Sequence, residues 1–283
     1  MKKTIMVTGA SGFIGTNFIS KYKDIFNIIP ICLIENKPEE LNYKGVDCIL
    51  HLAALVHQMN GAPDEKYFEI NTELTRRLAI KAREEGVKHF VFYSSVKVYG
   101  YDGNLTDSNF ILGINSECHP TDPYGKSKYE AEKILNSLKD ENFKVSIIRP
   151  PMVYGSGVKG NMLNLIKLVE KVSILPFSYD EFKRSIVSID NLLFITSEII
   201  EYQKEGIVIP QDDKTLSIKE IIEGIGNSLN KKIYLFRFPK PIFKLMCKMK
   251  PNIMIRLYGG LQFEKTEKTI ESTKNGLKKM IEN

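Results

Sequence analysis

The sequence lacks most features of a secreted or membrane-embedded protein. It has only four cysteines, none in a paired C-x-x-C spacing, which argues against a zinc site or a disulfide framework. No apolar run approaches the roughly 18 residues that a membrane span needs, and the first three residues lead into a strand-like segment instead of the apolar core of a secretory signal. We therefore expect a cytoplasmic protein without a membrane partner, with reduced thiols at Cys32, Cys48, Cys118 and Cys247.

Charge and histidine patterns disfavour further classes of function. The net charge of +6 arises from 40 basic and 34 acidic residues, which we interpret as interleaved, so a nucleic-acid-binding patch is not expected and a small acidic ligand is compatible. His57, His89 and His119 share no ligand spacing, so no metal site is expected. A length of 283 residues with 43% hydrophobic residues predicts one large globular domain or two small ones.

A glycine-rich turn follows the first predicted strand. Residues 4–8 form a β-rich run, and a helical pattern extends from the turn to about Tyr22. Glycines at positions 9, 12 and 15 allow a tight turn, close approach of the backbone to a pyrophosphate and close packing of helix on strand, while the helix N-terminus offers unpaired N–H groups to the anion. This context predicts a dinucleotide site at Gly9, Ser11, Gly12, Phe13, Ile14 and Gly15.

Apolar strands and amphipathic helices then alternate along the chain. Strands are expected at residues 47–52, 89–94 and 144–149, and helices near residues 72–85 and from Tyr124. The alternation predicts an α/β fold of Rossmann type, a doubly wound parallel sheet with helices on both faces. Ligands of such sheets bind at the carboxyl ends of the strands, and Ser94-Ser95 falls at one of these ends.

Tyr124 and Lys128 lie four residues apart at a predicted helix start. Asp122 supplies an N-cap and Pro123 a first-turn proline, so the two side chains lie one turn apart on one face, about 6 Å from each other. A free tyrosine, with a pKa of about 10, holds its proton too tightly to act as a base at neutral pH, and a neighbouring cation favours the phenolate. The pair alone also fits surface packing, but beside a dinucleotide site it predicts proton transfer from a hydroxyl or to a ketone.

Five motifs follow one another along the chain: Thr8-Gly9-x-x-Gly12-x-x-Gly15, His51-Leu52-Ala53-Ala54, Ser94-Ser95-Val96-Lys97-Val98-Tyr99-Gly100, Tyr124-x-x-x-Lys128 and Arg149-Pro150-Pro151-Met152-Val153-Tyr154-Gly155. Together they resemble the extended short-chain dehydrogenase/reductase family of nucleotide-sugar epimerases, dehydratases and ketoreductases, which bind NAD or NADP on a first domain and a nucleotide-diphosphate sugar between two domains. The resemblance implies that Tyr124 is the acid/base, that Lys128 binds the nicotinamide ribose and lowers the tyrosine pKa, and that Ser95 hydrogen-bonds the sugar oxygen. It also places Leu52, Ala53 and Ala54 at the cofactor, which carries the hydride step.

Departures from these motifs narrow the expected reaction. The family's 4,6-dehydratases have an Asp-Glu pair after the residue that matches Ser95, whereas this chain has Val96-Lys97, so dehydration is not expected. Met152 stands where many members have an Asn that contacts the nucleotide sugar, so the substrate must be held differently. By this resemblance we expect chemistry at sugar C4, as a 4-epimerase or 4-ketoreductase of a UDP-hexose or UDP-N-acetylhexosamine in the synthesis of surface polysaccharide precursors.

The resemblance also suggests substrate contacts outside the catalytic pair. Lys97 is assigned to the substrate, Asn161 matches a residue near the diphosphate, and Arg184 matches one that meets the phosphates or ribose. Arginine suits phosphate because its planar donors bind in pairs, although a solvated charge at a strand start is the alternative for Arg184. The rival function is a non-catalytic NAD(P)-binding sensor or scaffold on the same fold, in which the tyrosine or lysine is commonly lost.

The interval after the second predicted strand is short. Only Glu35–Gly45 separates a strand near residues 28–34 from the next strand near residue 46, too little chain for a crossover with its helix. We therefore expect one edge strand to be missing. Glu35 lies about 20 residues beyond Gly15, where an acidic residue binds the ribose 2′-OH of NAD and repels the 2′-phosphate of NADP. The expected cofactor is NAD, with NADP possible.

Two domains are expected. Residues 1–150 form the dinucleotide-binding domain and residues 151–283 a smaller mixed substrate domain, from which about 186–197 return to the first. Residues 239–258 are basic and apolar, and because Pro241 and Pro251 interrupt them, a lid or helix pair of the substrate domain is favoured over a membrane-surface helix. Many family members pair through two helices per subunit, so a homodimer through the helices near Thr72 and Tyr124 is expected.

Overall fold

The computed structural model describes residues 2–56 and 62–280, so His57 lies outside the described part of the chain. The chain divides into two compact units. The first contains Met1–Gly100, Glu117–Pro150 and Leu193–Val208, and the second Tyr101–Ser116, Pro151–Leu192 and Ile209–Asn283. This partition differs from the expected domains in two places: the segment that returns to the first unit is 193–208 instead of about 186–197, and residues 101–116 belong to the second unit.

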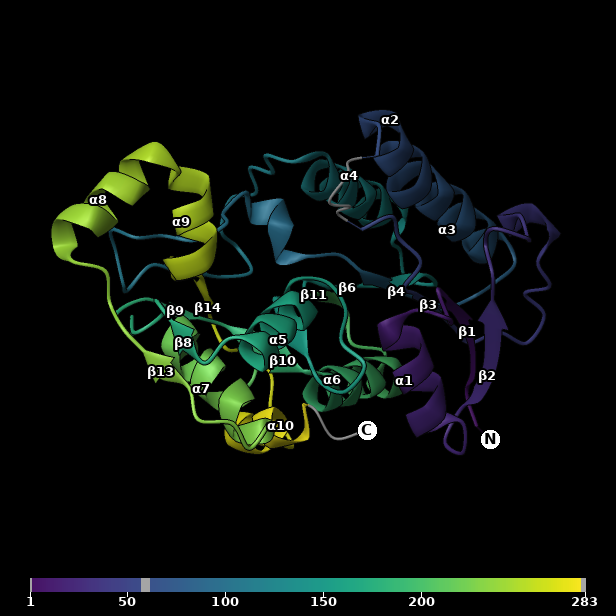
Figure 1. The fold of residues 1–283 in the computed structure, drawn as a ribbon. Helices are drawn as coiled ribbons and strands as arrows, with labels where there is room; N and C mark the ends of the chain where they lie inside the picture. Colours follow the sequence, from purple (N-terminus) through teal and green to yellow (C-terminus); the bar gives the residue numbers. More distant parts are fainter. Residues whose placement is uncertain (1, 57–61, 281–283) are drawn as a thin grey trace. The chain divides into compact units, whose positions relative to one another are not determined.

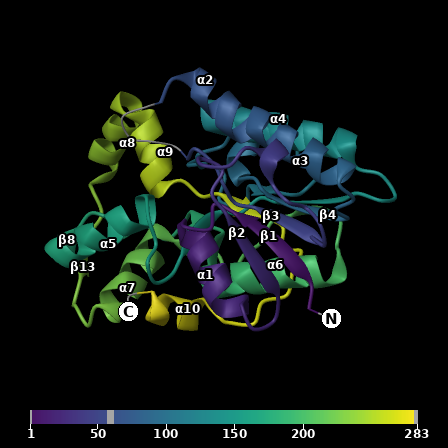
Figure 2. The same cartoon turned by 90° about the vertical axis from the view of Figure 1, so that its right-hand side faces the viewer.

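A parallel sheet of six strands lies at the centre of the first unit, in the order β11-β6-β4-β3-β1-β2 (Figure 1, Figure 2). The strands are β1 (Thr4–Thr8), β2 (Asn27–Ile31), β3 (Cys48–His51), β4 (His89–Tyr93), β6 (Lys144–Ile148) and β11 (Gly206–Val208). Every neighbouring pair is parallel. The predicted α/β fold with a parallel sheet is therefore confirmed, and the returning segment supplies its last strand.

Helices cover both faces of this sheet. The helices are α1 (Phe13–Tyr22), α2 (Asp64–Tyr67), α3 (Leu74–Glu84), α4 (Pro123–Leu138) and α6 (Ile189–Tyr202). In Figures 1 and 2, α3 and α4 lie on one side of the strands, and α1 and α6 on the other. All five residues of β4 are buried, because Phe90 and Phe92 join the core beneath α3 and α4, while the Tyr93 hydroxyl lies 2.5 Å from Thr196 Oγ1 of α6.

The second strand is an edge of the sheet, as the short interval predicted. β2 pairs only with β1 in the described sheet, and between β2 and β3 the chain forms a single 3₁₀ turn, η1 (Pro38–Glu40). A bidentate pair of hydrogen bonds from Arg77 of α3 to Glu39, 2.8 and 2.6 Å long, links this turn to the helix layer. The strand itself ends at Ile31, three residues before its predicted end.

The second unit is built from small two-stranded pairings and helices. Its strands are β5 (Ile111–Leu112), β7 (Met152–Tyr154), β8 (Ile174–Leu175), β9 (Lys183–Arg184), β10 (Ile186–Ser188), β12 (Leu216–Ser217), β13 (Tyr234–Leu235) and β14 (Gln262–Phe263). Its helices are α5 (Asn161–Lys171), α7 (Ile218–Ser228), α8 (Lys240–Met249), α9 (Pro251–Tyr258) and α10 (Thr273–Lys279). Residues 101–116 join this unit because β5 pairs with β14. The predicted helix pair at 239–258 is present as α8 and α9, and each begins at a proline-bearing first turn.

A buried ion pair fixes α4 to the end of β6 in the first unit. Arg149 donates from Nε to Glu132 Oε1 at 3.0 Å and from Nη2 to Glu132 Oε2 at 2.6 Å, and its Nη1 donates to the Tyr99 hydroxyl at 2.8 Å. Burial disfavours the guanidinium charge, but the hydrogen bonds and charge of Glu132 outweigh it and hold the pKa of Arg149 above its usual value. The pair therefore stabilises the helix position only while both partners are present.

Replacing Glu132 alone should cost more stability than replacing the whole pair. Glu132→Leu leaves the Arg149 charge buried without a counter-charge, which we expect to cost about 3 to 5 kcal/mol of unfolding free energy. The double variant Glu132→Leu/Arg149→Met removes both charges and should recover much of that loss. Urea unfolding of the three proteins measures the difference. A double variant no more stable than the single one would show that the ion pair is not the source of the cost.

Candidate active site

The carboxyl ends of four strands lie side by side in the first unit. In the strand register Thr8 is opposite His51, His51 is opposite Phe92, and Tyr93 is opposite Ile148. The chain segments that follow these residues therefore leave the sheet along one edge. They are the glycine turn after β1, Leu52-Ala53-Ala54 after β3, Ser94-Ser95 after β4 and Arg149-Pro150 after β6.

The three glycines of the first turn have different roles. Gly9 has a φ of +68°, and a Cβ there would lie 2.7 Å from the Ala53 backbone nitrogen. A Cβ on Gly15 would lie 2.4 Å from the Gly9 carbonyl oxygen, so this glycine allows α1 to pack against the turn. Gly12, by contrast, meets only the Gly9 oxygen at 3.2 Å, so a side chain there would project away from the protein. The open side at Gly12 is where a pyrophosphate can approach the backbone.

The N-terminus of α1 is also suited to binding a pyrophosphate. Gly12 is its N-cap residue and offers no side-chain acceptor, so the first amides of the helix have neither an intrahelical nor a capping partner. Exposed Ser11 and half-buried Phe13 and Ile14 complete the turn. These donors suit a diphosphate, and the residues present therefore fit a dinucleotide.

Ser94 supplies a second sign of a ligand at this edge. Its backbone nitrogen donates to the Ile148 carbonyl at 2.7 Å, but its buried Oγ has no hydrogen-bond partner among the described residues. Buried hydroxyls are ordinarily paired. A polar ligand at the carboxyl end of β4 would supply the missing partner.

A buried histidine positions the segment after β3. His51 Nε2 lies 2.8 Å from Thr75 Oγ1, which donates its own proton to the Asn71 carbonyl, so Nε2 must be the protonated nitrogen. Nδ1 then accepts from Thr8 Oγ1 at 2.7 Å, and that oxygen accepts from the Ala53 N–H at 3.3 Å. Burial lowers the pKa of His51 to about 3, with a smaller effect of the Lys128 charge. His51 is thus a neutral residue that holds Ala53 in place, not an acid or base.

Tyr124 and Ser95 are brought together by the structure. Asp122 caps α4 as predicted, accepting from the Gly125 amide at 2.7 Å. Burial raises the pKa of Tyr124 to about 12, and its hydrogen bond with Ser95 opposes this only in part. The helix spacing predicts that a nearby cation favours the phenolate, but desolvation is the larger effect in the protein alone. Without ligands Tyr124 keeps its proton at neutral pH.

Lys128 lies in the interior, one turn further along α4. The residue is 2% exposed, and its Nζ donates to the Tyr93 carbonyl oxygen at 2.7 Å and lies 4.4 Å from the centre of the Phe92 ring. Burial lowers its pKa to about 7, with Glu132 acting in the opposite direction. The helix spacing predicted that Lys128 shares the face of Tyr124, and it did not predict so complete a loss of hydration.

Asn71 is the main residue that sequence reasoning missed. It lies in the π-helical turn η2 (Phe68–Glu73) that precedes α3, and it is fully buried. Its side chain accepts from the Leu55 amide at 2.8 Å and donates to the Leu55 carbonyl and to Ser127 Oγ, each at 3.0 Å. Thr72 Oγ1 donates to the Ser127 carbonyl at 2.8 Å. Together they join the segment after β3 to the first turn of α4, and π-turns of this kind are frequent at functional sites.

The other predicted residues have varied surroundings. Glu35 is exposed in the turn after β2, and Lys97 lies in the 3₁₀ turn η3 (Val96–Tyr99), 3.4 Å from Asp122. In the second unit, exposed Asn161 begins α5. One terminal nitrogen of Arg184 lies within hydrogen-bond distance of the carbonyls of Asp102, Ile255 and Arg256, at 2.9 to 3.0 Å. Burial lowers the Arg184 pKa to about 10, and the carbonyl contacts hold this half-buried guanidinium within the second unit.

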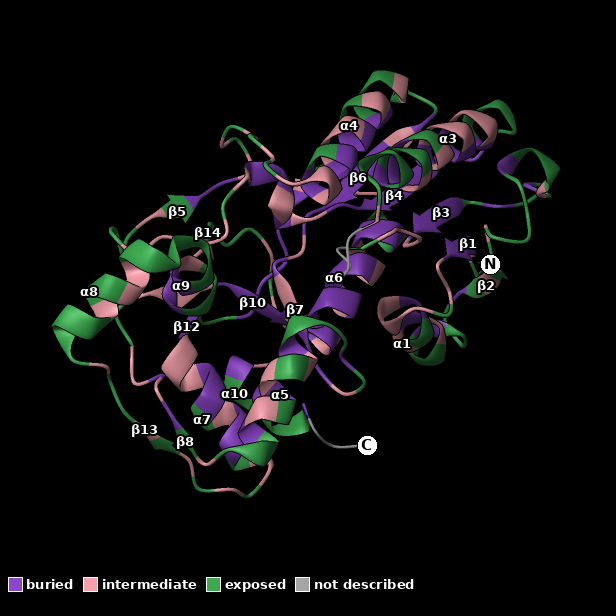
Figure 3. Ribbon diagram, turned by 45° about the horizontal axis from the view of Figure 1, so that its top comes forward, coloured by how far each residue is buried: buried purple, intermediate pink, exposed green. Residues whose placement is uncertain are grey.

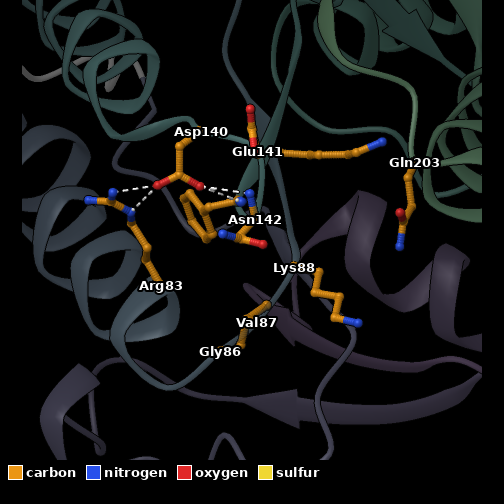
Figure 4. A pocket seen from close by; sticks show the side chains of 10 residues that line it. Arg83, Gly86, Val87, Lys88, Asp140, Glu141, Asn142 and Gln203 are labelled. Carbon is orange, nitrogen blue, oxygen red and sulfur yellow. Dashed lines mark hydrogen bonds and ion pairs between the residues drawn. The ribbon is translucent and has the colours of Figure 1, made fainter.

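The linings of two cavities include none of Ser95, Tyr124 and Lys128. One, of about 540 Å³, is at the amino ends of β4 and β6, and its lining includes the ion pair of Arg83 and Asp140 (Figure 4). The other, of about 490 Å³, is in the second unit and is lined by residues such as Lys183 and Asp213. Within residues 2–56 and 62–280, no group of His, Cys, Asp and Glu is arranged to hold a metal ion, and no helix has the length and apolarity to cross a bilayer.

The parallel sheet, the glycine turn and the Ser95, Tyr124 and Lys128 group define a dinucleotide-binding oxidoreductase fold. The model of the NAD dependent epimerase/dehydratase family matches residues 5–208. The chain belongs to this family and is an NAD(P)-dependent enzyme, so the reading as a non-catalytic sensor or scaffold is not retained.

Two curated relatives and one solved structure show the range of similar proteins. A UDP-glucose 4-epimerase of Vibrio cholerae is 36% identical over 291 aligned residues, which cover 93% of this chain and 88% of the relative. An N-acetyl-alpha-D-glucosaminyl-diphospho-ditrans,octacis-undecaprenol 4-epimerase of Escherichia coli O157:H7 is 28% identical, covering 86% and 77%. The crystal structure of the dTDP-4-dehydrorhamnose reductase of Bacillus anthracis in complex with NADP shares the fold, with a TM-score of 0.77 at 17% identity over 99% of each chain.

Replacing Gly12 by alanine should weaken NAD binding, whereas replacing Gly15 by alanine should lower folding stability. A methyl group on Gly12 meets little protein, so Gly12→Ala should keep stability within about 1 kcal/mol while weakening NAD binding at least about tenfold, because it blocks the pyrophosphate. Gly15→Ala forces a methyl group onto the Gly9 carbonyl and should cost about 1 to 3 kcal/mol. Thermal unfolding and calorimetric titration with NAD test both. Unchanged NAD affinity in Gly12→Ala would contradict this placement of the cofactor.

Lys128→Met should stabilise the folded chain most at low pH. The pKa of Lys128 in the folded protein, about 7, lies below the usual 10.5. Below pH ~7 the lysine is charged in both states, and the full cost of burying the charge destabilises the folded protein. Between pH ~7 and 10.5 the folded lysine is neutral while the unfolded one is still charged, so this cost falls as the pH rises. Each pH unit in that window is worth about 1.4 kcal/mol. We expect the gain from Met to be about 2 to 3 kcal/mol larger at pH 6 than at pH 9 in urea unfolding. A gain that does not vary with pH would rule out a buried charge at this position.

Proposed function

We propose that the protein is a 4-epimerase of a nucleotide-diphosphate sugar, a UDP-hexose or UDP-N-acetylhexosamine, used for surface polysaccharide precursors. The observation that carries this proposal is the hydrogen bond between Ser95 and Tyr124 at the carboxyl edge of the sheet, with Lys128 buried one helical turn away. The two curated relatives described above are both named 4-epimerases, which supports C4 as the reacting carbon.

The proposed roles follow from which atoms can hold or move a proton. When bound, the nicotinamide cofactor supplies the site that takes a hydride from sugar C4 and returns it. As a phenolate, Tyr124 accepts the proton of the sugar 4-hydroxyl as C4 is oxidised, and as a phenol it gives that proton back as C4 is reduced. Ser95 Oγ orients the sugar oxygen by a hydrogen bond. Return of that hydride to the opposite face of C4 would invert the sugar configuration with no net consumption of cofactor.

The pKa of Tyr124 sets a condition on this cycle. With a pKa of about 12 in the protein alone, Tyr124 is ready to donate a proton but not to accept one. Its deprotonation must therefore accompany formation of the complete site. Lys128, with a pKa near 7, can carry the positive charge that favours the phenolate once a partner for its ammonium is present.

The surroundings of Ser95 disfavour a dehydratase. The next two residues are Val96, which is buried, and Lys97, whose ammonium lies 3.4 Å from Asp122. Neither supplies a carboxylate for water elimination.

We propose Lys97, Asn161 and Arg184 as substrate contacts. One terminal nitrogen of Arg184 is held by three backbone carbonyls. We also propose that the cofactor is NAD and that Glu35 helps to bind it. The proposed oligomer is a homodimer that pairs through α3 and α4.

The E. coli relative raises a second candidate substrate. By its name that protein acts on N-acetylglucosamine carried on undecaprenyl diphosphate, in place of a nucleotide. Both substrates present a sugar on a diphosphate, so the C4 chemistry proposed for Tyr124 is the same. The assay should therefore include a polyprenyl-diphosphate N-acetylglucosamine beside the UDP-sugars.

Tyr124→Phe should nearly abolish turnover. The purified protein is incubated with NAD and UDP-N-acetylglucosamine or UDP-glucose, and sugar configuration is followed by NMR and cofactor by absorbance. We expect inversion at C4 without net cofactor consumption, reduced about 10²- to 10⁴-fold in Tyr124→Phe because the proton at O4 can no longer be transferred. NAD titration should be unchanged in that variant.

Tyr129→Phe, on the same helix, is the matched control and should keep full activity. If the protein instead oxidises a reduced dinucleotide stoichiometrically in the presence of a 4-keto sugar, its activity is that of a 4-ketoreductase and not of an epimerase. If Tyr124→Phe turns over at the rate of the unaltered protein, the assignment of the acid/base is wrong.

A further inference from the structure

Positive charge is concentrated in one segment of the second unit. Between Gly224 and Phe263 the chain has eight lysines and arginines and no acidic residue. This exceeds the net charge of +6 for the whole protein, so the remainder of the chain is net acidic. The interleaving of charges expected for the whole chain does not hold for this segment.

The helices α8 and α9 within it expose apolar side chains. Ile242, Leu245 and Met249 recur at helical spacing on α8, and Ile253 and Leu257 do so on α9. Their exposed fractions lie between 38% and 67%, and no residue of α8 is buried (Figure 3). An exposed group of this kind is unusual on a protein that binds nothing there.

Aromatic packing on the other side of α8 already anchors the pair. The Phe243 ring lies 4.7 Å from the Tyr179 ring and 5.3 Å from the Tyr258 ring, centre to centre. Tyr258 and Met254 are buried on α9. The exposed aliphatic side chains are therefore not needed to hold the helices to their unit.

Exposed lysines are interspersed in the sequence with these apolar side chains. Lys240, Lys244 and Lys248 are spaced by four residues along α8, and Lys250 follows between the helices. All four are exposed, and none forms an ion pair with the described residues of the chain. By contrast, Arg237 and Arg256 are each paired with carboxylates.

We propose that the exposed face of α8 and α9 docks onto an anionic phospholipid surface. Aliphatic side chains enter the headgroup boundary while the lysines contact lipid phosphates, the arrangement of an interfacial helix. Cores of protein–protein interfaces are enriched in aromatic residues, methionine and arginine and depleted in lysine, whereas this face has four lysines and mostly aliphatic Ile and Leu side chains. A second copy of the chain would bring like charges together, which disfavours self-association through this face. The sequence pattern predicted a helix pair here and no membrane partner, and for the exposed face of that pair this proposal replaces the second expectation. The docking surface is independent of the reaction proposed above.

Vesicle binding by the full chain tests the proposal. Purified protein is sedimented with vesicles of phosphatidylcholine containing 30% phosphatidylglycerol, and with vesicles of phosphatidylcholine alone, in 0.1 M salt. We expect binding to the anionic vesicles only. The triple variant Lys240→Gln/Lys244→Gln/Lys248→Gln should bind about 100-fold more weakly, on the order of fivefold per lysine. Leu245→Ser/Met249→Ser/Ile253→Ser, which keeps every charge, should also lose most binding.

The matched control carries the same change of charge elsewhere. Lys23→Gln/Lys44→Gln/Lys139→Gln alters three exposed lysines of the first unit and should bind like the unaltered protein. Absence of binding to the anionic vesicles, equal binding to both lipids, or an equal loss in this control would each overturn the proposal. So would a dimer in sedimentation analysis that the serine variant dissociates, since a second copy would then cover the face. None of these readouts requires turnover, so failure here and failure of the 4-epimerase are distinguishable.

Discussion

The proposed catalytic group of the first unit depends on holding a lysine where it is poorly solvated. Lys128 has exchanged water for one carbonyl oxygen and the face of an aromatic ring, and its pKa near 7 reflects that loss of hydration. Such a side chain would turn outward if its helix could move. The surrounding contacts prevent this: Glu132, one turn further along α4, is held by Arg149, and Ser127 is held by Asn71. The free-energy cost of the buried lysine is thus met by bonds to its neighbours on the same helix.

The same dry surroundings affect neighbouring groups in different ways. His51 has a partner for each ring nitrogen and is kept neutral, so it serves to position Ala53. Tyr124 has one partner, Ser95, and burial holds its proton on. A residue whose hydrogen-bonding positions are all occupied is held in place. A residue with an unused hydrogen-bonding position near a ligand can exchange a proton with that ligand. The difference in partners, more than the difference in residue type, separates the two roles.

Much of this arrangement could be predicted from local sequence. The bounds of β1, the cap of α4 and the missing edge strand follow from strand patterning, a capping carboxylate and the length of one interval. The conserved geometry of parallel sheets then places the ends of β1, β3 and β4 together. What could not be predicted depends on distant contacts. The π-turn that carries Asn71 has no periodic signature, and Arg184 binds carbonyls contributed by residues about 70 to 80 positions away.

The pKa of Tyr124 shows why proximity in sequence is a poor guide to electrostatics. The four-residue spacing correctly places Lys128 on the same helix face, and from that spacing alone a cation should lower the tyrosine pKa. In the folded protein the cation has been desolvated as well, and its own pKa has fallen toward 7, so its charge at neutral pH is no longer guaranteed. Burial therefore acts on both members of the pair, weakening the charge that was expected to activate the tyrosine while raising the tyrosine pKa directly. In the proposed mechanism, a pair that depends on its ligands to become active would not transfer protons to or from water, so desolvation of the site would have a catalytic use as well as an energetic cost.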